Sequence, residues 1–175
     1  MTTSLPVASA SRHLPSARQL IALIGVASLA LIAGAWFFEL VVHLLPCKLC
    51  LEQRLPHYTA IGLALAGLAL AHSPRLQWLV LLGLAGLMAW STGLGVYHAG
   101  VEWGWFLGPN DCGGAAPAVA GMQDFMKQLQ AARIVACSEA AWRFLGLSLA
   151  GWNALASAGL FLLAVFGLLR GKAPA

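Results

Sequence analysis

Long apolar runs separated by short polar stretches are the main pattern along this chain. Four of these runs reach, or nearly reach, the roughly 20 residues of helix needed to cross a bilayer core of about 30 Å. They lie at about residues 20–38, 54–71, 76–96 and 152–169. The second run reaches spanning length only if its helix includes residues before Pro56. The pattern predicts an all-α membrane protein in which residues 20–170 form a single four-helix transmembrane bundle.

Composition supports this interpretation, because 60% of the 175 residues are hydrophobic and only 9% are charged. A soluble domain has about a quarter charged residues. The first run also has features of a cleaved signal peptide, since Arg12 and Arg18 precede it and residues 33–35 (AGA) resemble a cleavage site. It continues through Phe38, however, which is long enough to span. We therefore expect it to remain as a helix.

The distribution of charge predicts which side of the membrane each loop faces. With four spans, both chain ends and the turn at 72–75 share one side, and that side carries Arg and Lys but no acid. Basic residues that flank spans closely mark the cytoplasmic side. The prediction is cytoplasmic segments at 1–19 and 171–175 and outer loops at about 39–53 and 97–151. In the second loop, residues 122–135 have apolar side chains at helical spacing, which predicts a short helix on the membrane surface, although a helix that packs on the bundle fits equally well.

This topology places all four cysteines on the outer side. Cys47 and Cys50 form a Cys-x-x-Cys motif in the first outer loop, and Cys112 and Cys137 lie 25 residues apart in the second. Disulfides persist outside the cytoplasm. One pair per loop is the arrangement that the count suggests, although four cysteines allow three connectivities. In a Cys-x-x-Cys motif one thiol commonly has a lowered pKa and acts as a nucleophile.

Arg54 follows Cys50 by four residues and adds a permanent positive charge. If this segment is helical, the two side chains share a face one turn apart. If Pro56 instead occupies the first helical turn, the helix begins just after Arg54. In both cases the cation favours a Cys50 thiolate and can donate hydrogen bonds to a carbonyl of a lipid-borne ligand. The alternative is an arginine that extends to lipid headgroups.

Other interpretations of these residues remain open. Both cysteine pairs could form purely structural disulfides. A metal site completed by a histidine (His43, His57 or His98) is less favoured, because an exposed thiolate cluster would be oxidised on this side, so we predict no metal ion. Glu102 is interpreted as a solvated loop acid. Small residues that should allow close helix contacts are Gly62, Ala66, Gly83 and Gly86.

Three motifs, in this order, resemble the DsbB family of bacterial membrane thiol:quinone oxidoreductases. They are "CKLCLEQRLPHY", "GVYHAGVEWGWFLGPNDC" and "CSEAAWRFLGLSLAGWNAL", and the likeness runs from about residue 20 to 169. The resemblance implies a multi-pass protein of the bacterial inner membrane, with cytoplasmic termini and periplasmic cysteine loops. It also implies an enzyme that re-oxidises a periplasmic DsbA-like thioredoxin-fold oxidase, with a quinone (ubiquinone or menaquinone) as cofactor. The expected partners are this oxidase, membrane lipid and the quinone pool, and no nucleic acid.

The resemblance also assigns residue roles. Cys47 and Cys50 match the pair that passes electrons to quinone, and Cys112 and Cys137 match the pair that oxidises the soluble partner. Arg54 and His98 match quinone-binding residues. Pro56 and the glycine-rich "DCGGAAPA" depart from the enterobacterial pattern. A reductase similar to vitamin K epoxide reductase is the rival family, but its Cys-x-x-Cys usually lies in the last helix, whereas here it precedes the second.

Overall fold

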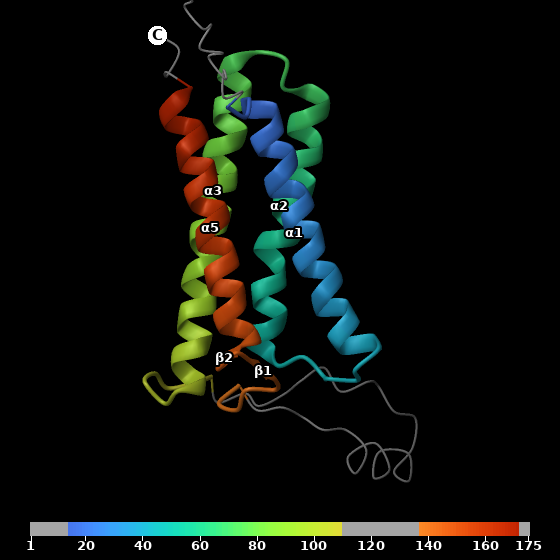
Figure 1. Cartoon of the computed structure of the whole chain (residues 1–175), viewed down its shortest axis with the longest axis vertical. Helices are drawn as coiled ribbons and strands as arrows, with labels where there is room; N and C mark the ends of the chain where they lie inside the picture. The colour runs from blue at the N-terminus through green and yellow to red at the C-terminus, as the bar shows by residue number, and fades with distance from the viewer. Residues whose placement is uncertain (1–13, 110–136, 172–175) are drawn as a thin grey trace, which may run out of the picture.

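In the part of the chain that the structure describes, four long helices lie side by side. The computed structural model describes residues 14–109 and 137–171. The helices are α1 (Ala17–Leu40), α2 (Lys48–Leu70), α3 (Pro74–Glu102) and α5 (Leu149–Arg170). They alternate in direction, so α1 begins and α5 ends at the same end of the molecule (Figure 1). Within the described residues, α1, α3 and α5 are long and apolar enough to cross a membrane. The chain is therefore a multi-pass membrane protein.

The helices extend beyond the predicted spans. The spans predicted at 20–38, 76–96 and 152–169 lie inside α1, α3 and α5, and the span at 54–71 overlaps α2 except for its last residue. α2 does not reach the apolarity of a span, because its first half is polar. Two predicted features, the surface helix at 122–135 and Cys112, lie outside the described residues.

The start of α2 decides between the two sequence interpretations of Pro56. Cys47 is the N-cap residue, and its sulfur accepts a hydrogen bond from the backbone N–H of Cys50 at 3.1 Å. This cap begins the helix at Lys48, so Pro56 lies inside α2 rather than in its first turn. The helix therefore continues through Arg54, and the alternative in which the helix begins after Arg54 was wrong. Cys50 and Arg54 consequently lie one turn apart on one helix.

A small hairpin is an exception to the predicted all-α fold. β1 (Arg143–Phe144) pairs antiparallel with β2 (Leu147–Ser148). The two residues between the strands, Leu145 and Gly146, have φ angles of 51° and 83°. Positive φ at both central positions is typical of the tight turn that suits a two-residue hairpin. The sequence did not predict this turn, because leucine is rarely found at such a position.

Close contact between helices occurs at glycines, but mostly not at the predicted ones. A Cβ atom added to Gly95 in α3 would lie 2.9 Å from the backbone of Ala154 in α5. The same test supports Gly83, which approaches Leu63 in α2. Gly62 and Gly86 have no neighbour within 4 Å, and Ala66 is exposed, so these three predictions were wrong.

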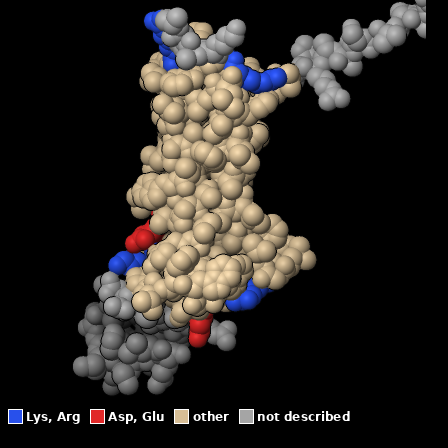
Figure 2. Space-filling model, turned by 90° about the vertical axis from the view of Figure 1, so that its left-hand side faces the viewer, with Lys and Arg blue, Asp and Glu red and all other residues tan. Residues whose placement is uncertain are grey.

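Charged side chains gather at the two ends of the molecule. On the face drawn in Figure 2, a broad band without Lys, Arg, Asp or Glu separates the two charged ends. Arg18 and Arg75 lie in the first turns of α1 and α3, and Arg170 ends α5, so all three lie at one end. The apolar band is the part of the surface that suits lipid.

Candidate functional site

The other end of the bundle brings three cysteines together. Cys47 and Cys50 lie at the start of α2, and Cys137 comes from the segment that leads to β1. The buried cluster at this place consists of Cys47, Leu49, Val101 and Cys137, with Cys50 packed against it. All three cysteines are free thiols in the structure. The structure therefore places three of the four predicted catalytic cysteines side by side, although they are separated by up to 90 positions in the sequence.

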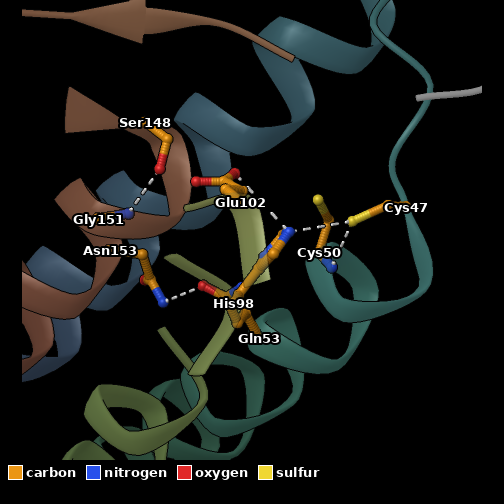
Figure 3. A network of polar contacts seen from close by, with 8 residues as sticks. All are labelled: Cys47, Cys50, Gln53, His98, Glu102, Ser148, Gly151 and Asn153. Atoms are coloured by element: carbon orange, nitrogen blue, oxygen red, sulfur yellow. Dashed lines mark hydrogen bonds and ion pairs between the residues drawn. The ribbon is translucent and has the colours of Figure 1, made fainter. Parts of the chain in front are cut away.

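His98 of α3 lies directly beside the thiol pair. It is 3% exposed, and its Nε2 is 3.6 Å from the sulfur of Cys47 (Figure 3). Its Nδ1 is 2.6 Å from Nε2 of Gln53. An amide nitrogen can only donate, so Nδ1 accepts, and a neutral ring carries its proton on Nε2. The N–H of His98 therefore points toward Cys47 and toward the carboxylate of Glu102, whose Oε1 is 3.8 Å away.

Gln53 and Asn153 form a polar bridge that sequence reasoning missed. Nδ2 of Asn153 in α5 donates to Oε1 of Gln53 in α2 at 2.7 Å (Figure 3). Gln53 in turn holds His98, so one chain of hydrogen bonds links α5, α2 and α3. The signal available in the sequence was an amide side chain three residues after Cys50, within a helix that otherwise needs apolar side chains. Such a residue marks either a polar contact between helices or a site.

Glu102 is buried, which corrects its interpretation as a solvated loop acid. Its side chain is 5% exposed, and its Oε2 has no hydrogen-bond partner in the described parts of the chain. The reason is that α3 continues to Glu102, beyond the predicted span end at residue 96. The acid therefore lies one helical turn from His98 instead of in a loop.

Arg54 is held inside the protein rather than at its surface. Its Nη1 lies 2.6 Å from Oε2 of Glu39, the side chains of Arg54 and Glu39 are 10% and 24% exposed, and the guanidinium stands 5.6 Å from the centre of the Trp36 ring. An arginine that extends to lipid headgroups would instead be exposed. The pair with Glu39 at the end of α1 fixes a positive charge beside the start of α2. Sequence reasoning did not find the role of Glu39.

The two thiols of the motif have opposite acidities. A hydrogen bond from Cys47 lowers the pKa of Cys50, and the charge of Arg54 adds a smaller effect in the same direction, while burial opposes both. The hydrogen bond with Cys50, together with burial, raises the pKa of Cys47. When the pair loses one proton, Cys50 is therefore the thiol that gives it up. Both residues precede the predicted span at 54–71.

A mostly apolar cavity of about 280 Å³ opens beside Cys50, between α1, α2 and α5. Its polar lining consists of Cys50, Gln53, Arg54, His57, His98 and Asn153. Apolar walls with a few polar groups are typical of sites for small organic ligands. A flat ring with carbonyl oxygens fits this set, because the guanidinium of Arg54 is a donor and the adjacent Cys50 sulfur is a source of electrons.

The same atoms also have the arrangement of a possible metal site. The sulfurs of Cys47 and Cys50 and a ring nitrogen of His98 lie within 4.8 Å of one another. A soft ion such as zinc would bind both sulfurs as thiolates. The raised pKa of Cys47 opposes the second thiolate. That no metal binds here stays a prediction.

Together, the fold and the site define a membrane-embedded oxidoreductase of the thiol class. Comparison with known proteins identifies the family, since the family described as "Disulfide bond formation protein DsbB" matches residues 17–167. The chain is 35% identical over 160 residues to disulfide bond formation protein B of Verminephrobacter eiseniae, covering 88% of this chain and 87% of that protein. It is 31% identical over 166 residues to the protein of the same name from Marinobacter nauticus, covering 91% and 96%. The chain belongs to the DsbB family and is a disulfide-generating enzyme.

Proposed function

We propose that this protein re-oxidises a periplasmic thioredoxin-fold oxidase of the DsbA type and passes the electrons to a membrane quinone. Cys47, Cys50, Cys112 and Cys137 carry the electrons, and Arg54 and His98 hold the quinone. The observation that carries the proposal is the shared cavity, in which Cys50, Arg54 and His98 line one apolar space. Either ubiquinone or menaquinone suits this lining.

The cysteines act by thiol–disulfide exchange. First, a thiolate of the reduced partner attacks Cys112 of a Cys112–Cys137 disulfide, and Cys137 leaves as a thiolate. Second, Cys137 attacks Cys47 of a Cys47–Cys50 disulfide, and Cys50 leaves as a thiolate. The other thiol of the partner then displaces Cys112 and releases the oxidised partner, Cys112 re-forms its bond with Cys137, and Cys47 and Cys50 are left reduced. The packing of Cys137 against Cys47 supports the second step, and the lowered pKa of Cys50 makes it the better leaving group.

The energetics of the partner call for an acceptor other than a disulfide. An oxidase of the DsbA type has a potential near −120 mV, whereas ordinary structural disulfides lie below about −300 mV. A 30 mV difference corresponds to about 1.4 kcal/mol, so an ordinary disulfide would face an uphill step of about 8 kcal/mol. A bound quinone supplies an acceptor for two electrons and two protons. Arg54 would donate to its oxygen, while the apolar walls would exclude water.

We further propose that all four long helices span the bacterial inner membrane, with both termini cytoplasmic and the cysteines periplasmic. The domain extends over residues 20–170, with short cytoplasmic segments at 1–19 and 171–175. The arginines at the end where α1 begins support this orientation, since such residues favour the cytoplasmic side. A membrane-impermeant thiol reagent added to intact spheroplasts should label Cys137 after mild unfolding. Labelling only after lysis would reverse the orientation.

The test of the reaction uses purified protein, a reduced thioredoxin-fold oxidase and a short-chain quinone. Quinone absorbance should fall only when all three are present, and Cys50→Ser should abolish the change. Retained quinone reduction in this variant would overturn the assignment of Cys50. Repeating the assay with benzoquinone and naphthoquinone rings determines which quinone the protein uses.

The order of the exchange steps has its own test. In Cys137→Ala, Cys112 is left as a thiol, so its thiolate attacks the disulfide of the oxidised soluble partner, one sulfur of the partner leaves as a thiolate, and the mixed disulfide should be detected on a non-reducing gel after acid quenching. Cys112→Ala is the matched control and should trap nothing. Equal trapping by both variants would refute the proposed entry point.

A further inference from the structure

His57 is a buried histidine that the proposed reaction leaves without a role. It is 2% exposed and lines the same cavity as Cys50 and Arg54. It follows Arg54 by three residues and Cys50 by seven, so the three side chains lie along one face of α2. A polar ring at this depth costs free energy unless its nitrogens are paired.

One nitrogen of this ring is well paired. Nε2 of His57 lies 3.0 Å from Oδ1 of Asn153, 3.1 Å from Oγ of Ser91 and 3.4 Å from Oγ of Ser157. Turning the amide of Asn153 alone would break its hydrogen bond to Gln53, because Nδ2 is the donor of that bond (Figure 3). Its Oδ1 can only accept, so Nε2 of His57 carries the proton.

The other nitrogen is then an unpaired acceptor. A neutral imidazole has one N–H, so Nδ1 of His57 presents only a lone pair. Nδ1 is buried, and no donor reaches it from residues 14–109 or 137–171. His57 is a lining residue of the cavity, and a ligand hydroxyl group that reached Nδ1 from there would satisfy this lone pair. A carbonyl oxygen would not, because it is itself an acceptor.

We propose that Nδ1 of His57 accepts a hydrogen bond from a ring hydroxyl of the hydroquinone, so that the cavity binds the reduced form of the quinone more tightly than the oxidised form. This inference rests on the proposed function and adds a residue that distinguishes the two redox forms. His57 lies one turn deeper along α2 than Arg54, on the same cavity wall. Arg54 is a donor and suits a carbonyl, whereas His57 is an acceptor and suits a hydroxyl.

The preference would favour the overall reaction. Two thiols lose two electrons and two protons as a disulfide forms. The quinone accepts the two electrons, and its two ring oxygens each accept one proton. Tenfold tighter binding of the hydroquinone raises the midpoint potential of the bound couple by about 30 mV. The acceptor thereby becomes more oxidising, which is the direction that the oxidation of a DsbA-type partner requires.

The test compares the binding of the two redox forms in a protein that cannot interconvert them. Cys50→Ser serves as the background, because it lacks the Cys47–Cys50 disulfide. A short-chain ubiquinone and its hydroquinone are titrated anaerobically into this protein, and tryptophan fluorescence gives each Kd. Adding His57→Leu should raise the hydroquinone Kd about tenfold and leave the quinone Kd nearly unchanged.

Ser157→Ala is the matched control, since it removes an oxygen beside Nε2 of His57 without touching Nδ1. It should leave the ratio of the two Kd values unchanged. An equal change of both Kd values in His57→Leu, or no change, would overturn the inference while leaving the proposed quinone site intact. Failure of the Cys50→Ser protein to bind either form would remove the proposed function as well.

A spectroscopic readout covers the case in which His57→Leu does not fold. In protein labelled with ¹⁵N-histidine, the Nδ1 resonance of His57 is identified by its loss in His57→Gln. This variant keeps an amide donor for Asn153. The resonance should shift when hydroquinone is added and stay in place when quinone is added. A shift with both forms, or with neither, would overturn the inference.

Discussion

The hydrogen bond between Gln53 and Asn153 should contribute measurably to the stability of the bundle. Gln53→Leu removes its bonds to His98 and to Asn153, at 2.6 and 2.7 Å, and leaves two polar groups without partners. Each such group costs about 1–3 kcal/mol when buried, and Asn153 is only partly buried, so we expect a loss of about 3 kcal/mol. Asn153→Leu should cost a similar amount, because it strips both Gln53 and His57 of a partner.

The double variant is the informative measurement. Each single variant breaks the bond between Gln53 and Asn153, so the sum of the two losses of unfolding free energy includes this bond twice. The double variant should therefore lose about 4–5 kcal/mol rather than about 6, which is a coupling of about 1–2 kcal/mol. Unfolding in mixed micelles by titration with SDS, followed by tryptophan fluorescence, gives these free energies.

A second cycle with a distant residue is the control. Arg18 donates to the carbonyl of Leu68 at the opposite end of the bundle, at 2.8 Å. Arg18→Met and Gln53→Leu share no partner, so their effects should add to within about 0.5 kcal/mol. If the free-energy losses of Gln53→Leu and Asn153→Leu were also additive, the hydrogen bond between α2 and α5 would contribute nothing to stability. That result would refute the prediction.

Three further changes test the thiol pair, the ion pair and the helix contact. The lowered pKa of Cys50 means that its thiolate persists below the ordinary value of 9.0, so alkylation across a pH series should have its midpoint below 9.0. Cys47→Ala should raise that midpoint, because it removes the largest cause of the shift. Glu39→Leu leaves Arg54 as a buried unpaired charge and should cost about 3 kcal/mol of unfolding free energy in the SDS titration. Gly95→Leu should cost about 3 kcal/mol in the same titration, because its side chain would meet the backbone of α5.

Each of these changes has a matched comparison. For the thiol pair, peptide mass spectrometry of the alkylated protein gives the pH midpoint of Cys50 alkylation. A midpoint at or above 9.0 would contradict the prediction. Glu39→Gln keeps an oxygen that accepts from Arg54, so a loss equal to that of Glu39→Leu would show that the pair contributes no hydrogen bond. Gly86→Leu enters open space and should change stability by less than about 0.5 kcal/mol, and a loss as large as that of Gly95→Leu would contradict the contact analysis.

The helices were predictable because lipid offers no hydrogen-bond partners to the backbone. An apolar run of spanning length must pair its own N–H and C=O groups, which a helix does without help from the rest of the fold. The sequence left open whether Cys50 and Arg54 share one helix, because that depends on where α2 begins, and the structure begins it at Lys48. The contacts between helices were not predictable, because they depend on how each helix is rotated about its axis. Gly62 and Gly95 look alike in the sequence, yet only Gly95 meets another helix.

α2 shows why the polar residues of the site were also hard to assign. Its polar first half keeps it below the apolarity of a span, although it packs between spans that meet that standard. Within that half, Gln53, Arg54 and His57 are each at most 9% exposed and paired with residues of α1, α3 or α5. A helix with buried, paired polar groups can lie in lipid only because its neighbours supply the partners. Those partners, Glu39 and Asn153 among them, come from distant parts of the sequence. Within α2 itself, low hydropathy is therefore the sign of a site to which all four helices contribute residues.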